Sequence, residues 1–224
     1  MPGAPSRPAL VTGGRPLRYR FTATNSDGKP ARWNPCGGPH QVLVNLAGAQ
    51  AGALTDLRTG LARLDAVTGL KFDIVGETSA VPGERWGQEG VSGAWPPVLI
   101  AWRSFSGTAD SGDAAHTTPV WVQNAQRRLV FVSAAIVFNT DDNGLYHSGP
   151  GGTMSRLGLV EHELGHLAGL DDIPGPGLEQ AGSDGAVGHE LMDRLVGSVD
   201  RYQTGDIRGL TLLGRGGCLT VPAP

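Results

Sequence analysis

The chain has 224 residues, of which 39% are hydrophobic and 17% are charged, and its formal net charge is −3 at pH 7. This length and apolar fraction are enough for one sizeable domain or two small ones with a buried core. A net negative charge is not typical of a nucleic-acid-binding protein, which usually has an excess of lysine and arginine. No apolar run approaches the length of a membrane-spanning helix.

The first part of the chain predicts a parallel βαβ unit, because two buried strands flank an amphipathic helix. Residues 1–17 contain no hydrophobic signal core and are expected to form a flexible segment, followed by a short strand within 18–28. The two buried strands are expected over 41–46 and 71–75. The apolar residues between them recur at spacings of three and four, which predicts a helix ended by Gly69. These residues are Leu54, Leu57, Leu61, Leu64 and Val67.

The second part of the chain predicts three more strands and two more helices. The expected strands cover residues 98–102, 119–123 and 129–139, with loops over 76–97 and 103–118. The strand that Pro119 opens is expected at the edge of the sheet. One helix is expected to start near residue 153 or 155 and to end at Gly169, and a last helix is expected over 204–213 with Thr204 as its N-cap.

Two cysteines, Cys36 and Cys218, lie near opposite ends of the chain. In a secreted protein, a pair placed in this way is expected to close one long loop as a disulfide. The alternative is that they are two unrelated buried thiols.

A metal-binding pattern lies in the helix that is expected to end at Gly169. His162 and His166 are four residues apart, so on a helix they lie one above the other, roughly 6 Å apart along the axis, and can point at one ion. Glu163 lies beside them, where it can act as general base on a water bound to that ion. The alternative is a solvated helical face that carries two incidental histidines.

A third protein ligand is predicted three residues beyond the end of this helix. Gly169 tolerates a positive φ, so the chain can turn back and bring Asp172 to the same ion. One alternative is Glu190, which lies on a later segment beside His189. The other is Asp171, which a slightly different turn would present, although a hydrogen-bonding or capping role suits it better.

The pattern HExxHxxGxxD over residues 162–172 resembles the metzincin metallopeptidase signature, with aspartate in place of the usual third histidine. A minority of metzincin-like peptidases, the small secreted snapalysin type among them, have aspartate at that position. Metzincins also have a methionine turn beneath the metal, and Met192 fits that role. The remaining motifs are similar, in order, to those of matrixin-like secreted bacterial peptidases, and they lie at residues 33–36, 68–70 and 205–214.

The resemblance implies a single catalytic domain over residues 18–224 with the zincin fold. Its upper part, residues 18–169, is expected to hold a twisted, mostly parallel five-stranded sheet with one antiparallel edge strand, packed on two long helices. Its lower part, residues 170–224, is expected to be small and irregular, with the methionine turn and the last helix. The implied class is α+β with an α/β-like upper part.

The same resemblance implies a zinc-dependent endopeptidase with one catalytic Zn²⁺. His162, His166 and Asp172 would bind the ion, and Glu163 would take the proton of the attacking water and pass it to the leaving amine. Met192 would form an apolar floor. A peptide or protein substrate is expected to lie extended along the edge strand. The central residues of that strand are Val120, Trp121 and Val122.

Two other classes of function remain as alternatives. One is a binding module or pseudoprotease that zinc stabilises, although a purely structural site needs no base such as Glu163 and is usually closed by a fourth protein ligand. The other is a zinc hydrolase that acts on a non-peptide amide. The protein is expected to be a secreted, extracellular bacterial monomer that binds no nucleic acid and does not span a membrane.

Some further residues have weaker functional interpretations. The segment around Cys36 resembles the cysteine switch that blocks zinc in matrixin precursors, but the first strand follows it at once. Arg194 stands where some metzincins have a tyrosine that can reach the metal. Tyr202 is the alternative candidate for that role. His116, near Asp110 and Asp113, is expected to lie in a polar surface loop rather than in a second metal site. A Ca²⁺ site is possible in such folds, but the segment at 140–144 lacks the spaced ligands of a calcium loop.

Overall fold

The computed structural model describes residues 18–83, 86–88, 90, 93–109, 112–141, 155–173, 190–193 and 199–224. These residues form a mixed α/β structure with a five-stranded sheet, a two-stranded sheet and three helices. The elements in chain order are β1 (Arg20–Phe21), β2 (His40–Asn45), α1 (Ala53–Thr68), β3 (Phe72–Glu77), β4 (Val98–Arg103), β5 (Ala115–Gln123), β6 (Leu129–Asn139), α2 (Arg156–Ala168), β7 (Leu170–Asp171) and α3 (Thr204–Gly214). The flexible segment expected at 1–17 lies outside the described residues.

The larger sheet has the strand order β3-β2-β4-β6-β5. Strands β3, β2, β4 and β6 run parallel to one another, and β5 pairs antiparallel with β6 at the edge. The prediction of a mostly parallel sheet with one antiparallel edge strand is therefore confirmed. β4 and β6 are buried along nearly their whole length, which is why their sequences are continuous apolar runs.

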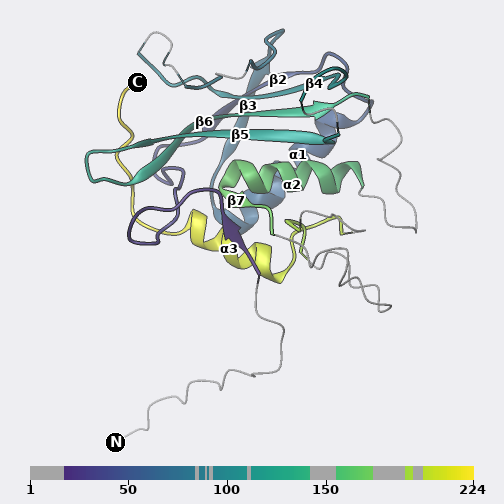
Figure 1. The fold of residues 1–224 in the computed structure, drawn as a ribbon. Coiled ribbons are helices and arrows are strands. Elements are labelled where there is room, and N and C mark those ends of the chain that lie inside the picture. Colours follow the sequence, from purple (N-terminus) through teal and green to yellow (C-terminus); the bar gives the residue numbers. More distant parts are fainter. Residues whose placement is uncertain are drawn as a thin grey trace, which may run out of the picture.

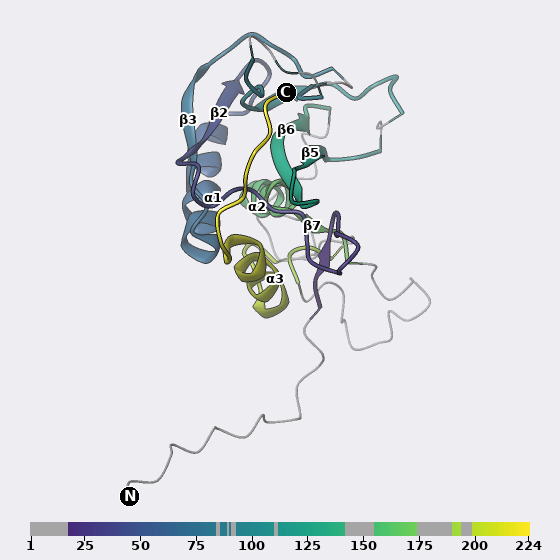
Figure 2. The ribbon, with the colours of Figure 1, turned by 90° about the vertical axis from the view of Figure 1, so that its left-hand side faces the viewer.

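The helices α1 and α2 pack against each other on one face of the sheet, and α3 lies beyond them (Figures 1 and 2). α1 buries Leu57, Leu61 and Leu64, three of the residues whose spacing predicts the helix, and Gly69 ends it with a φ of 73°. None of the helices in the described part of the chain combines the length and the apolar content that crossing a membrane requires.

The prediction of a loop over residues 103–118 is wrong at its end, because β5 begins at Ala115. The polar sequence after Ala115 is typical of a loop, but here it pairs residue by residue with the buried strand β6, which supplies its hydrogen-bond partners. Most residues of β5 are only half-buried, so an edge strand tolerates these polar side chains. Pro119 therefore lies inside the strand and does not open it.

Two smaller features also differ from the sequence predictions. The N-cap of α3 is Gln203 and not Thr204, because Gln203 and Asp206 form a reciprocal capping box. β1 lies within residues 18–28, where a short strand is predicted, but it pairs antiparallel with β7, which is not predicted. Strands of two residues are too short to have a detectable hydrophobic period.

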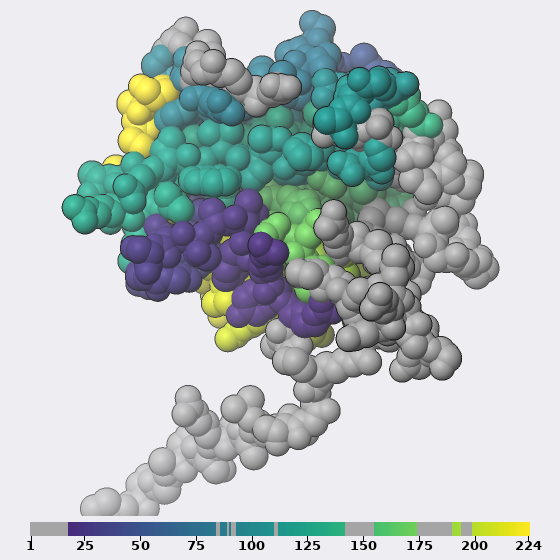
Figure 3. Space-filling model, viewed as in Figure 1, coloured from purple at the N-terminus to yellow at the C-terminus, as the bar shows by residue number. Residues whose placement is uncertain are grey.

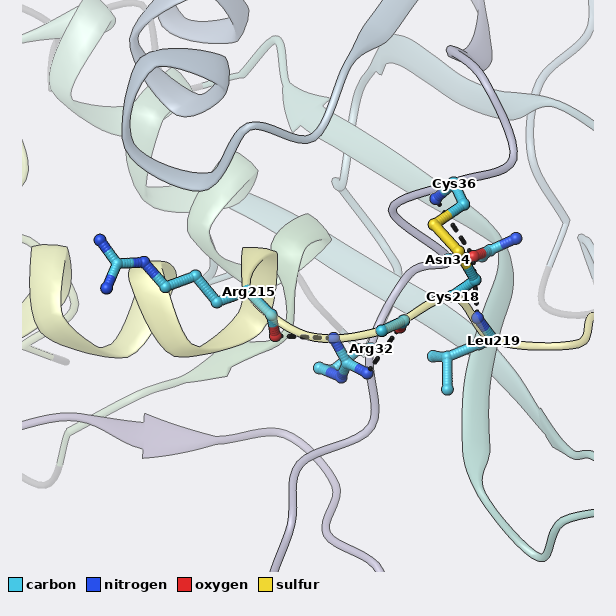
Figure 4. Close-up of a disulfide and its surroundings, with 7 residues drawn as sticks. Arg32, Asn34, Cys36, Arg215, Cys218 and Leu219 are labelled. Atoms are coloured by element: carbon cyan, nitrogen blue, oxygen red, sulfur yellow. Dashed lines mark hydrogen bonds between the residues drawn. A yellow bond between two sulfur atoms is a disulfide. The ribbon is translucent and has the colours of Figure 1, made fainter.

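The disulfide between Cys36 and Cys218 is present, as predicted, and it joins positions 182 residues apart in sequence. No free cysteine is left, so the structure contradicts a cysteine-switch role for Cys36. Figure 4 shows the chain after α3 running past the segment that precedes β2. There Asn34 Oδ1 accepts a hydrogen bond from Leu219 N at 3.0 Å, which adds to the covalent link.

Side chains from the loops that adjoin β5 and β4 hold the rest of the C-terminal segment. Asn124 Nδ2 donates to the Thr220 carbonyl at 3.0 Å, and Trp95 Nε1 donates to the Pro222 carbonyl at 2.7 Å. The last residues are therefore fixed at several points, and the disulfide closes a loop that contains nearly the whole fold.

Replacing both cysteines by serine is expected to lower the free energy of unfolding by about 3–5 kcal/mol, because a loop of this length restricts the unfolded chain strongly. Urea denaturation of the Cys36→Ser/Cys218→Ser variant and of the wild type measures the difference. A reducing agent should destabilise the wild type by a similar amount and leave the variant unchanged. Equal midpoints for the oxidised wild type and the variant would contradict this role.

Candidate metal centre

The helix α2 carries His162, Glu163 and His166, as the sequence predicts. Its N-terminus is capped by Ser155, whose Oγ accepts a hydrogen bond from Gly158 N at 2.9 Å. The helix is buried along most of its length, including His162 at 7% and Glu163 at 4% exposure. The functional residues are thus held on a rigid element inside the protein.

Gly169 ends α2 and reverses the chain. Its φ is 116°, and its N–H donates to the carbonyls of Gly165 and His166. A Cβ added at Gly169 would lie 2.8 Å from the Phe131 ring, so both the backbone conformation and the packing require glycine. The chain then continues through β7 to Asp172, which confirms the predicted turn.

Backbone carbonyls orient the two imidazoles of α2. Nδ1 of His162 lies 2.8 Å from the Leu191 carbonyl oxygen, and Nδ1 of His166 lies 2.9 Å from the Leu170 carbonyl oxygen. An Nδ1–H that donates to a carbonyl leaves Nε2 as the unprotonated nitrogen in the neutral ring. This is the usual arrangement around metal-binding histidines.

Asp172 brings a carboxylate oxygen to the same point. Its Oδ1 lies 3.3 Å from His162 Nε2 and 3.4 Å from His166 Nε2, and the two nitrogens are 3.1 Å apart. These contacts are longer than charge-assisted hydrogen bonds of about 2.7–2.9 Å. Oδ1 is buried and has no hydrogen-bond partner among the described residues. The three atoms therefore surround a common point and do not form a closed hydrogen-bonded network.

The donor set and its spacing fit a divalent ion. An ion with four tetrahedral ligands at about 2.0–2.2 Å has neighbouring ligand atoms roughly 3.3–3.5 Å apart, close to the spacing found here. In the described part of the chain, His162, His166 and Asp172 form the group of potential ligands that meets this requirement. Two imidazoles and a carboxylate are a known catalytic zinc set.

Met192 packs against α2 at Gly165, between His162 and His166 in sequence. It is buried, at 1% exposure, and a Cβ added at Gly165 would lie 2.4 Å from its Sδ. Gly165 therefore lets the methionine approach the helix between the two histidines. The Met192 carbonyl accepts a hydrogen bond from Ile173 N at 2.8 Å, which joins this turn to the segment after Asp172.

The turn that contains Met192 is held by the N-terminus of α3. Asp206 accepts hydrogen bonds from Leu191 N at 2.6 Å and from Met192 N at 3.3 Å. Because the Leu191 carbonyl orients His162, the carboxylate of Asp206 helps to position this imidazole through the turn. The sequence analysis did not identify Asp206 in this role, since only the tertiary structure brings the two segments together.

Glu163 is held by a residue of the edge strand. Thr117 of β5 has its Oγ1 2.5 Å from Glu163 Oε2, so the hydroxyl donates to the carboxylate and orients it. The sequence analysis missed Thr117 because it assigned residues 103–118 to a loop. The available signal was the pair of β-branched residues Thr117 and Thr118, which favours a strand.

A cleft of about 460 Å³ lies above the metal centre, between β5, α2 and the segment that contains Thr22. In Figure 3 the green surface of the α2–β7 region lies between the teal β5–β6 strands and the purple N-terminal segment. The cleft is lined by His162, Glu163, His166 and Asp172 and by the first half of β5, including His116, Thr117 and Pro119. The predicted substrate residues Val120, Trp121 and Val122 belong to β5 but lie beyond this lining.

The two alternative metal ligands make other contacts, although Asp171 also lines the cleft. Glu190 accepts hydrogen bonds from Gly205 N and Asp206 N and therefore caps α3. Asp171 pairs with Arg20 at 2.9 Å, and its Oδ1 accepts from the backbone N–H of the next residue, as a capping residue does. His189, the neighbour of Glu190, lies outside the described residues.

The remaining candidates have structural positions or lie outside the described part. The Tyr202 hydroxyl donates to the carbonyl of Glu161 at 2.7 Å and is buried, so it supports α2 and does not line the cleft. His116 lies on β5 at the cleft and not in a surface loop as expected. Asp113 is an exposed residue of the cleft wall, while Asp110 and Arg194 are outside the described residues.

The nearby carboxylates favour the protonated form of His166. Burial lowers the pKa of His166, but its interaction with Asp172 and the charge of Glu163 outweigh burial and raise that pKa to about 9. Burial raises the pKa of Asp172, but His162 and His166 hold it well below its usual range. The charges of the group thus favour an ionised Asp172 carboxylate beside a protonated imidazole.

The stability of the metal-free protein is expected to fall as the pH rises from about 6.5 to about 9. The pKa of His166 is about 9 in the folded protein and about 6.5 in an unfolded chain. Its stabilisation is therefore complete below pH 6.5 and is lost as the pH rises through 9. Urea denaturation of chelator-treated protein across this range measures the effect. A His166→Gln variant should lack the decline, and parallel curves for the two proteins would contradict the assignment.

A scan against protein-family models and a search of curated proteins found no match to this chain.

Proposed function

We propose that the protein is a zinc-dependent endopeptidase of the metzincin type. One observation carries the proposal. Two imidazole nitrogens and a carboxylate oxygen converge in a cleft that also contains the carboxylate of Glu163 and the open edge of β5. A metal-dependent peptide hydrolase needs three protein ligands with an open fourth position, a general base and a strand edge that can bind an extended peptide.

The chain's residues would divide into ligands and supports. His162, His166 and Asp172 would hold the ion, while the carbonyls of Leu170 and Leu191 keep the imidazoles in the correct tautomer. When bound, zinc supplies Lewis acidity to the scissile carbonyl and to water. Since the same donors accept other first-row divalent ions, elemental analysis of purified protein tests the choice of zinc.

Glu163 would be the general base and then the general acid. Its carboxylate lies in the cleft next to His162 on α2, and Thr117 donates to one of its oxygens. Its other oxygen is available to take the proton of a water that attacks the peptide carbonyl. The same carboxyl group then gives that proton to the leaving amine, which prevents expulsion of an unstable amide anion.

The edge of β5 would bind the substrate backbone. Asn139 N donates to the Ala114 carbonyl, so Ala114 is in a hydrogen-bonded position opposite β6. Hydrogen-bonded and non-hydrogen-bonded positions alternate along an antiparallel pair, so the backbone N–H and C=O groups of Ala115 and Thr117 point away from β6. Pro119 belongs to the same outward set, where its missing N–H costs no hydrogen bond to β6. An extended peptide added at this edge would lie along the cleft above Glu163.

Two further features support the metzincin type and an extracellular location. Met192 packs against Gly165, the residue before His166, which supports the proposed role as a methionine floor. The disulfide between Cys36 and Cys218 suits an oxidising compartment, which favours secretion. Outside this centre, the described residues contain no comparable group of potential ligands.

The test is cleavage of a labelled, unfolded protein substrate by purified protein. Cleavage should stop when a chelator removes the metal and should return when zinc is added back. A binding module would retain the substrate without cleaving it under any of these conditions. A hydrolase of non-peptide amides would leave the protein substrate intact but hydrolyse simple amides in a metal-dependent way, and either result would refute the endopeptidase proposal.

A further inference from the structure

A second hollow, of about 540 Å³, lies between the chain around β1, the β5–β6 turn and the segment after α3. It shares no lining residue with the cleft of the metal centre. Its apolar lining comes from Phe21, Pro30, Leu129, Leu212 and Leu219. Its cationic lining includes Lys29, Arg32 and Arg128. An apolar wall and a cationic wall therefore face the same space.

The positive charges of Lys29, Arg32 and Arg128 outnumber the carboxylates that pair with them. Arg128 Nη1 pairs with Asp27 Oδ2 at 2.6 Å, and Lys29 shares the same carboxylate at 3.4 Å. The side chain of Arg128 is only 32% exposed. Among the described residues, Asp27 is the one carboxylate that pairs with these side chains, so the charge of Arg32 is left without a counter-ion.

Arg32 is held in place by backbone dipoles alone. Its Nη1 donates to the Arg215 carbonyl at 2.8 Å and its Nη2 to the Gly217 carbonyl at 3.4 Å, as Figure 4 shows. The Arg215 guanidinium points away from Arg32 in the same view. Burial and the nearby charge of Arg128 both lower the pKa of Arg32. A half-buried cation beside a second cation is electrostatically costly, and an anion would relieve that cost.

We propose that this hollow binds a small organic anion, with an apolar body against the leucines and one anionic oxygen group between Arg32 and Arg128. Guanidinium groups suit carboxylate, sulfonate and phosphate oxygens, because their N–H donors match such groups in pairs. The site is independent of the metal centre and does not rest on the proposed peptidase activity.

Octane-1-sulfonate is a suitable probe, because it combines an alkyl chain with an anion and is a weak metal ligand. Isothermal titration of the intact protein, below the concentration at which the probe forms micelles, measures its dissociation constant. Arg128→Gln removes one cation of the hollow and leaves Asp27 paired with Lys29. Arg127→Gln is the matched control, since Arg127 is the exposed neighbour that does not line the hollow and its loss changes the net charge equally.

The Arg128→Gln variant is expected to bind the sulfonate about tenfold more weakly than the wild type, since it loses a charge-assisted contact. The Arg127→Gln variant should bind within about twofold of the wild type, because only a screened surface charge is lost. The neutral analogue 1-octanol should bind more weakly than the sulfonate. No measurable binding to the wild type, equal binding of the two probes, or equal effects of the two substitutions would each overturn the proposal.

Discussion

Replacing Glu163 by glutamine is expected to lower peptide turnover by about a thousandfold while the metal content stays unchanged. Glutamine has nearly the same shape and can still interact with the hydroxyl of Thr117, which lies 2.5 Å from the carboxylate. It cannot accept the proton of the attacking water, so only the base is lost. Initial rates on one fluorogenic peptide and elemental analysis of the same samples measure both quantities.

The matched control for Glu163 is Asp113→Asn, which removes one negative charge from the wall of the same cleft. Asp113 is exposed and has no place in the proposed proton transfer, so its variant should keep turnover within a few-fold of the wild type. Similar losses in the two variants would mean that the charge of the cleft matters and not a specific base. Full activity of the Glu163→Gln variant would contradict the proposed role of Glu163 as general base.

Replacing Asp172 by alanine is expected to weaken metal binding by on the order of a hundredfold or more and to abolish turnover with it. Loss of residues that only support ligands costs about 10–100-fold in affinity, and Asp172 is proposed as a ligand itself. Its Oδ1 lies 3.3 Å from His162 Nε2, and no other carboxylate among the described residues joins the group. Competition with a chromogenic chelator measures the affinity.

Asp171→Asn is the control for this experiment, because it changes the adjacent carboxylate by the same charge. Asp171 pairs with Arg20 on the β1–β7 ribbon, so its substitution should leave metal affinity within a few-fold of the wild type. The reverse result, with Asp171 essential and Asp172 dispensable, would contradict the geometry described for the centre. Undiminished binding in both variants would point to a ligand from outside the described residues.

The part of the site that local spacing determines could be predicted. Helical periodicity places His162, Glu163 and His166 on neighbouring positions, and a glycine is the residue that reverses a chain at a helix end. Asp172 follows from that reversal and from the resemblance to the metzincin signature. Each of these predictions depends on residues close together in the chain, where the backbone geometry is nearly fixed.

The supports of the site could not be predicted, because they come from distant segments. The Leu191 carbonyl reaches His162 over 29 residues, and Thr117 reaches Glu163 over 46 residues. Thr117 also lies in a stretch whose polar composition is typical of a loop and whose strand conformation depends on pairing with β6. The hollow with Arg32 likewise forms only when the C-terminal segment packs against the residues before β2.

In the proposed reaction, this cleft hydrolyses internal peptide bonds with Glu163 as the base. The most direct measurement is digestion of a complex peptide mixture in ¹⁸O-labelled water, analysed by mass spectrometry, with zinc-loaded wild type and Glu163→Gln side by side. We expect new internal cuts whose carboxyl termini carry ¹⁸O in the wild-type digest, and we expect these cuts to be missing from the digest of the variant. An uncut mixture from the zinc-loaded wild type, or the same cuts from both proteins, would contradict the proposed reaction.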